Sequence, residues 1–322
     1  MKQTVLGIDI SKKDFHVVLI NENKTSKPKV FLNQPQGFED LLNWLRKLGV
    51  SQVHACMEAT SIYGEALAEY LFEAGHTVSI VNPSRIKGFA KSELIRTKTD
   101  QLDAGLIARF CVAVAPAAWT PLPPEIKELQ ALLRRLESLT QMYQQEQNRL
   151  ETATATVAQL IESHLQYLQQ LITQVKQLIE DHFEKYPILK AQRDLLTSIP
   201  GIGQQTASLL LGEMGNVAQY RSARQLAAHA GLTPQEYSSG SSVKGKPRLS
   251  HVGNARIRKA LYMPAVVAMR HNPLLRCFSE RLLARGKLKM QVLGAVMRKL
   301  LHLVYGILKS NQPFDPQYLS QE

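Results

Sequence analysis

The sequence predicts an α/β domain followed by helical domains (α/β plus α), and three observations lead to this fold class. Short apolar segments alternate with helix-like spacing over roughly the first ninety residues. A stretch with neither proline nor glycine then runs from residue 125 to residue 186. Beyond it the helical spacing continues, interrupted by a loop rich in serine, glycine and lysine. We therefore expect domains at residues 1–120, 125–186 and 190–322.

The N-terminal domain shows five strand-like segments and two amphipathic helices. The strands are expected at residues 5–10, 15–20, 29–32, 52–57 and 77–81, and the helices at 36–48 and 62–74. The first three strands follow one another as hairpins, whereas the last two alternate with helices. This order implies a mixed sheet with helices on its faces. It is the order of a ribonuclease-H-like (RuvC-like) fold.

In the central domain, apolar residues recur every three or four positions, and their register shifts by one position near Leu160. This spacing predicts a coiled coil of two long helices, or of one helix with a stutter. A hairpin bend at the register shift fits equally well. Because an apolar stripe needs a partner helix, we expect self-association through this region unless the same chain covers the stripe.

The net charge of +12 is concentrated in the last third of the chain. Residues 201–322 carry the whole excess, and residues 237–311 contain 15 basic residues and one acid, Glu280. This imbalance favours contact with nucleic acid over an ordinary solvated face. An anionic membrane is the weaker interpretation, since no amphipathic anchor or lipidation signal accompanies the charge.

The sequence also bears on cellular location. It has no run of about eighteen apolar residues, so we expect no membrane span. We see no signal peptide. The three cysteines are scattered, odd in number and without metal-ligand spacing, which is typical of reduced thiols; they are Cys56, Cys111 and Cys277. We therefore expect a cytoplasmic protein.

Four acidic residues are candidates for a metal site. Asp9 is the one charge in the first strand, Glu58 directly follows the fourth strand, and Asp100 and Asp103 share one helix face. Taken singly, Asp9 could belong to a turn, and the other two aspartates could serve the helix dipole after Thr99 as N-cap. Together, oxygen ligands of this kind hold Mg²⁺ or Mn²⁺ for phosphoryl transfer.

Two further segments suggest chemistry on a nucleic acid. Residues 199–203, between helical stretches, have the sequence Ile-Pro-Gly-Ile-Gly, which is typical of a helix-hairpin-helix that binds phosphates through backbone amides. A plain αα-hairpin is the alternative. Residues 238–246 contain four serines beside several cations, which suits either a flexible loop or a nucleophile, and residue chemistry does not choose among the four. No Ser-His-Asp order is evident, and His229 and His251 fit a structural role as well as a catalytic one.

Several motifs occur together in a characteristic order: Gly7-Ile8-Asp9-Ile10-Ser11, Met57-Glu58-Ala59-Thr60, Lys98-Thr99-Asp100-Gln101-Leu102-Asp103-Ala104, residues 199–203, Ala230-Gly231-Leu232-Thr233-Pro234, Tyr237-Ser238-Ser239-Gly240-Ser241-Ser242 and Arg258-Lys259-Ala260-Leu261-Tyr262-Met263. In this combination the chain resembles the bridge-RNA-guided insertion-sequence transposases, a family that includes the pilin-gene-inverting recombinases. The resemblance extends over nearly the whole chain.

The resemblance implies a RuvC-like domain, a coiled coil and a C-terminal transposase domain. It implies that Asp9, Glu58, Asp100 and Asp103 bind Mg²⁺ (or Mn²⁺) and that Ser239 is the nucleophile, which cleaves DNA through a covalent phosphoserine before strand exchange. The implied partners are target and donor DNA, a structured noncoding guide RNA and further copies of the chain, as a dimer or tetramer. A basic C-terminal third without an obvious base-reading helix agrees with reading by an RNA.

Three functions remain open on this basis: an RNA-guided transposase, a site-specific DNA invertase of the same family, and a non-catalytic nucleic-acid-binding scaffold. The intact set of four acids and Ser239 argues against the scaffold. The chain alone does not separate transposase from invertase.

Overall fold

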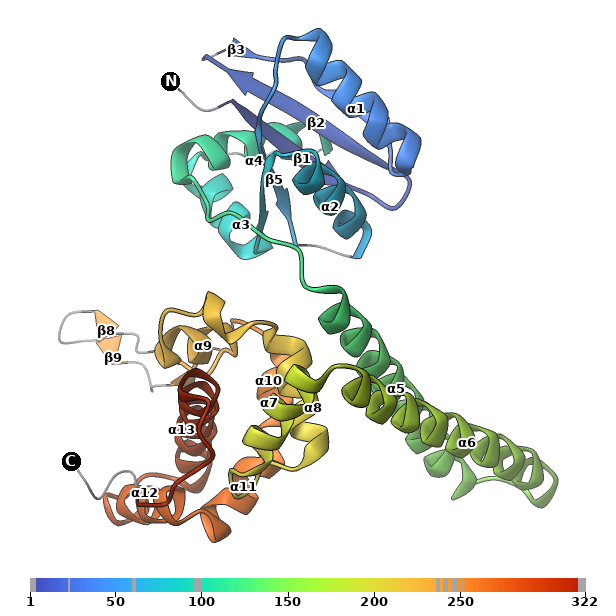
Figure 1. Ribbon diagram of the computed structural model, residues 1–322, viewed down its shortest axis with the longest axis vertical. Helices are drawn as coiled ribbons and strands as arrows, with labels where there is room; N and C mark the ends of the chain where they lie inside the picture. Colours follow the sequence, from blue (N-terminus) through green and yellow to red (C-terminus); the bar gives the residue numbers. More distant parts are fainter. Residues whose placement is uncertain are drawn as a thin grey trace. The chain divides into compact units, whose positions relative to one another are not determined.

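The computed structural model describes residues 4–22, 24–59, 62–94, 100–235, 238–239, 243–244, 248–250 and 252–317. Contacts divide the chain into two compact units, Met1–Pro121 and Leu122–Glu322, which are described separately (Figure 1).

The first unit is built on one mixed sheet. Its strands are β1 (Val5–Ile10), β2 (Asp14–Asn21), β3 (Lys24–Thr25), β4 (Lys29–Leu32), β5 (His54–Glu58) and β6 (Thr77–Val81). The order is β3-β2-β1-β5-β6, and β4 also pairs with β2. Strands β1 to β4 pair antiparallel, whereas β1, β5 and β6 are parallel. This confirms the predicted ribonuclease-H-like arrangement.

Helices cover both faces of the sheet: α1 (Pro35–Lys47), α2 (Glu65–Glu73), α3 (Pro83–Ser92) and α4 (Asp100–Val114). Strand alternation sorts the core into two clusters. Leu6 and Ile8 pack in the cluster that includes α1 and α2, whereas Val5 packs in the cluster that includes α3 and α4. Helix α3, which buries only Ile86, was not expected from the sequence.

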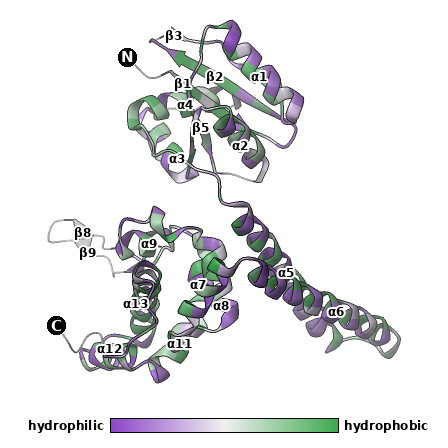
Figure 2. Ribbon diagram, viewed as in Figure 1, coloured by the Kyte–Doolittle hydropathy of each residue, from purple (hydrophilic) through white to green (hydrophobic). Residues whose placement is uncertain are grey.

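The second unit begins with two long helices, α5 (Pro124–Leu150) and α6 (Ala155–Lys185), which pack against each other along one side (Figure 1). Of the alternatives left open by the sequence, the structure has a hairpin bend, but at residues 151–154 rather than at the register shift near Leu160, which lies within α6. Buried positions midway along the two helices include Leu139, Leu168 and Ile172. Hydrophobic and hydrophilic residues alternate along both helices (Figure 2), as expected for a two-helix hairpin.

In its described residues, the rest of this unit is mainly helical, with four two-residue strands. It contains α7 (Pro187–Thr197), α8 (Gln204–Met214), α9 (Ala223–His229), α10 (Ala255–Ala260), α11 (Tyr262–His271), α12 (Pro273–Ala284) and α13 (Lys289–Ser310). Its core cluster also includes Ile126 and Leu129 of α5. The base of the long hairpin is therefore part of the C-terminal core.

Helix α13 packs against α7, α9, α11 and α12. Among the described residues it is the one helix long and apolar enough to cross a membrane, and half of that stretch is buried inside the protein. Its buried residues include Val296, Leu300 and Val304. This burial is typical of a core helix, since a core helix can be as long and as apolar as a membrane span.

Candidate active site

Two of the predicted acids lie at the ends of neighbouring strands. In the parallel pairing of β1 with β5, Ile8 lies opposite Met57, so Asp9 and Glu58 occupy the next positions along the two strands. Two residues before them, Gly7 lies opposite Cys56, which packs in the cluster that includes α3 and α4. Because alternate residues share a face, both carboxylates project from this side of the sheet.

Helix α4 packs closely against this face of the sheet because β1 has a glycine, Gly7, at the point of contact. A Cβ atom at Gly7 would collide with the backbone of Ala104 and Ala108. The glycine therefore lets α4 approach β1 more closely than any other residue would. It fixes the height of α4 above the two strands that carry the acids.

The direction of α4 places its first turn near the acids. Toward its C-terminal end, Cys111 lies beside Cys56 and beside His54, at the start of β5, and both neighbours help to lower the pKa of its thiol. The helix therefore runs antiparallel to β1 and β5, and its N-terminal end points to the strand ends that carry Asp9 and Glu58. Asp103, in the first turn, is half-buried. The side chain of Asp100, three residues earlier, lies outside the described residues, as does Thr99.

The oxygen-only donor set suits a hard divalent cation, but the described part of the chain contains no group of three or more acidic, histidine or cysteine side chains arranged to hold a metal ion. Asp9, Glu58 and Asp103 each interact with other groups of the protein. The fold thus brings three acids to one end of the sheet face that α4 covers. The described side chains do not form a complete metal site.

His16 is a residue at this site that the sequence did not single out. It lies directly opposite Asp9 in the antiparallel pairing of β1 with β2. Its neighbour Val18 packs in the cluster that includes α4, so His16 and Asp9 share a face. The histidine is half-buried. Strand alternation in β2 was the signal that could have found it.

The cysteines are free thiols, and two of them are buried, Cys56 on β5 and Cys111 on α4. The hydrogen bond between Cys56 and Cys111, together with burial, raises the pKa of the Cys56 thiol, so it stays protonated. This agrees with the expected reduced thiols.

The serine-rich segment forms a β-hairpin where the sequence predicted a loop. Strand β8 (Ser238–Ser239) pairs with β9 (Val243–Lys244), and β7 (Pro234–Gln235) pairs with β10 (Arg248–Leu249). Two-residue strands are too short to show an alternation, which is why the pattern was missed. Ser241, Ser242 and Lys246 lie outside the described residues, as does His251, and the side chain of Ser239 is not described.

The base of this hairpin is anchored to the helices. Gly253 adopts a φ of 140°, and a Cβ there would collide with the backbone of His229 and Gly231. Asn254 caps α10 through its Oδ1 and donates from Nδ2 to Glu213 (2.8 Å). These contacts fix where the hairpin leaves the C-terminal core.

The predicted helix-hairpin-helix joins α7 to α8. Gly201 has a φ of 109°, and a Cβ there would press against Pro264 and Ala268 of α11. Ile199 and Ile202 are buried. The glycine therefore has a packing role, in addition to the turn that the motif predicted.

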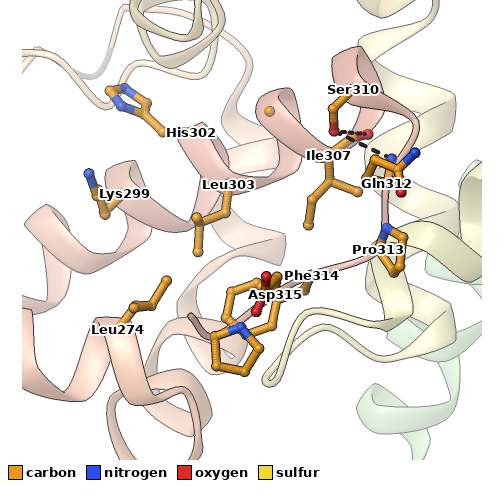
Figure 3. Close-up of a pocket in the computed structure, with 12 residues that line it drawn as sticks. Leu274, Lys299, His302, Leu303, Ile307, Ser310, Gln312, Pro313, Phe314 and Asp315 are labelled. Atoms are coloured by element: carbon orange, nitrogen blue, oxygen red, sulfur yellow. Dashed lines mark hydrogen bonds between the residues drawn. The ribbon is translucent and has the colours of Figure 1, made fainter. Parts of the chain in front are cut away.

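A separate pocket of about 700 Å³ lies between α12, α13 and the segment that follows α13 (Figure 3). Leu303, Ile307 and Phe314 form much of its apolar lining, and Lys299 and His302 lie at one side. It contains none of the predicted site residues.

Two family profiles match this chain. One, described as the transposase IS116/IS110/IS902 family, matches residues 193–280. The other, a transposase profile of the DEDD IS110 type, matches residues 6–158. The first match includes the serine-rich β-hairpin and the helices that anchor it. The second includes the sheet and helices that carry the predicted acids.

Several individual proteins are similar to this chain over most of its length. The pilin gene-inverting protein of Moraxella lacunata is 36% identical over 318 residues, covering 98% of each chain. The transposase for insertion sequence element IS1328 of Yersinia enterocolitica is 25% identical over 304 residues, covering 83% of this chain and 84% of the relative. Among solved structures, Thermus thermophilus RuvC is 16% identical, with a TM-score of 0.29, covering 36% of this chain and 100% of that chain.

Proposed function

Because the chain belongs to the IS110/IS116/IS902 family of transposases, we propose that it cuts and rejoins DNA at a composite active site. One part consists of Asp9, Glu58, Asp100 and Asp103, and the other is Ser239. The observation that carries the proposal is the convergence of Asp9, Glu58 and the first turn of α4 at one end of one sheet face.

The four carboxylates would hold Mg²⁺ or Mn²⁺, which would supply positive charge to the attacking and leaving oxygens. In this proposal the Oγ of Ser239 attacks the phosphorus of a phosphodiester. A P–O bond to the deoxyribose breaks, the DNA phosphate becomes esterified to serine, and the serine proton is lost as the leaving oxygen gains one. Lys244 and Arg248, on the same hairpin, would stabilise charge on the phosphate.

The acid half of the site is tested by Asp103→Asn. The variant should fold with an unchanged melting temperature and lose recombination, because a neutral amide binds the cation weakly. EDTA should abolish activity of the wild type. Full activity in either case would contradict the metal proposal.

The serine half is tested by trapping. Ser239→Ala should remove a protease-sensitive protein–DNA adduct that Ser241→Ala and Ser242→Ala retain. An adduct that survives in Ser239→Ala, or a wild type that forms none, would instead favour a metal-activated water as nucleophile.

We also propose that a structured noncoding RNA reads the DNA sequence, that the chain acts as a dimer or tetramer, and that it works in the bacterial cytoplasm, bound to the nucleoid. Support for the RNA is the basic C-terminal third, which suits contact with backbones rather than base edges. RNA that copurifies with the protein and maps beside its gene would support this.

A site-specific invertase is the second candidate, and one observation favours it. The similarity to the pilin gene-inverting protein extends over 98% of both chains. An invertase would recombine a fixed local site, whereas a transposase would move the element that encodes it. Sequencing of the DNA junctions made in cells distinguishes the two outcomes.

A further inference from the structure

The connection between α12 and α13 exposes large apolar side chains among cations. Residues 283–290 are all exposed. Within them, Leu288 and Met290 are 70% and 65% exposed. Arg285, Lys287 and Lys289 alternate with these two, and no acidic residue occurs from 281 to 314.

The backbone of this connection is held by hydrogen bonds at both ends. After α12, Gly286 adopts a φ of 75°. Its N–H donates to the Leu283 carbonyl (2.8 Å) and the Lys287 N–H donates to the Leu282 carbonyl (3.2 Å), which together form a Schellman motif. At the other end, the Leu288 N–H donates to the side chain of Gln291 (3.1 Å). The apolar side chains are thus presented on an ordered turn.

Leu288 also occupies a position where leucine lowers helix stability. It is the N-cap of α13, where Ser, Thr, Asp or Asn would accept a hydrogen bond from a free backbone N–H. Leucine has no oxygen to offer, and its side chain is left in water. Neither helix stability nor core packing accounts for this residue, which is free to contact a partner.

We propose that residues 283–290 form a wedge for double-stranded DNA, in which Leu288 and Met290 enter the minor groove and separate a base step. The flanking cations would hold the two phosphate backbones. Charge complementarity selects DNA as the occupant, and apolar wedges on basic elements unstack base pairs in this way. The inference rests on the proposed function, since strand exchange requires a duplex that has been opened.

The test is a substitution with opposite effects on stability and binding. Leu288→Ser supplies an N-cap, so the melting temperature should rise or stay unchanged. Affinity for a short duplex should fall roughly tenfold, as expected for loss of one buried leucine. The fluorescence of 2-aminopurine in the duplex, which reports unstacking, should no longer increase. Ile188→Gln, at a 79% exposed residue of α7, is the matched control and should change neither affinity nor fluorescence.

A second variant separates the wedge from general phosphate binding. Lys287→Gln should lower the slope of log affinity against log salt by about 0.9, whereas Leu288→Ser should leave the slope unchanged. Unstacking that persists in Leu288→Ser would overturn the wedge. So would a defect seen on vesicles of anionic phospholipid but not on duplex DNA. A wild type that binds no duplex at low salt would overturn the proposed function as well.

Discussion

At the residue scale, Gly7 makes the strongest prediction about the acid site. Gly7→Ala adds a methyl group where the backbone of Ala104 and Ala108 leaves no room. We expect a loss of about 1–3 kcal/mol in the free energy of unfolding, from overpacking. We also expect recombination to fall further than this loss explains, because α4 and Asp103 must move away from β1. Thermal unfolding and a recombination assay measure the two effects.

Gly105→Ala is the matched control, one helical position from Ala104. There a Cβ would lie 3.9 Å from Arg109 and 4.0 Å from Val18, which is ordinary contact. Replacing glycine in a helix should stabilise α4 by up to about 1 kcal/mol and preserve activity. Equal loss of activity in both variants would show that α4 tolerates no change, and the specific role of Gly7 would be wrong.

The residues of the site differ in how far the sequence could predict them. Asp9 and Glu58 could be picked out as candidates from the sequence, because a charge at the end of an apolar strand is unusual. Gly7 could not be predicted, since its role depends on which helix lies beside it, and His16 could be found only by combining the alternation of β2 with its pairing to β1. The anchor formed by Gly253, Asn254 and Glu213 depends on contacts between residues 41 positions apart.

At the element scale, strands were predicted better than connections. The bounds of β1, β4 and β6 agree with the expected ranges, because period-two or continuous apolar runs mark them. The two long helices were expected too, but their closure into a hairpin was not decided, since apolar spacing is the same whichever helix covers the stripe. The serine hairpin was missed because its strands carry no pattern.

The closed hairpin determines which variant tests self-association. Leu132 and Leu136 pack against the core of their own chain, so replacing them with lysine should lower stability first. Leu160 on α6 is 70% exposed. We expect Leu160→Lys to lower the oligomeric mass measured by light scattering, with an unchanged melting temperature. An unchanged mass would show that this part of the hairpin joins no second copy.

At the scale of the whole molecule, the two units have different charge and chemistry. The predicted acids lie in Met1–Pro121, whereas Ser239 and most of the net positive charge lie in Leu122–Glu322. The C-terminal core includes Ile126 and Leu129 of α5. A fragment used to measure nucleic-acid binding by this unit should therefore begin at residue 122, because a later start would remove part of its core.

Because the predicted acids and Ser239 belong to different units of the chain, two inactive variants should restore each other's activity when mixed. Asp9→Asn retains the serine, and Ser239→Ala retains the acids. If each active site takes its acids from one subunit and its serine from another, a mixed oligomer contains one complete site. We therefore expect the mixture to form the covalent protein–DNA adduct that neither variant forms alone. An active site drawn from two subunits would also make cleavage depend on assembly. The serine-bearing subunit should carry the adduct, which a size tag on one variant identifies. A mixture as inactive as its components, with subunit exchange verified by the tag, would place both parts in one chain.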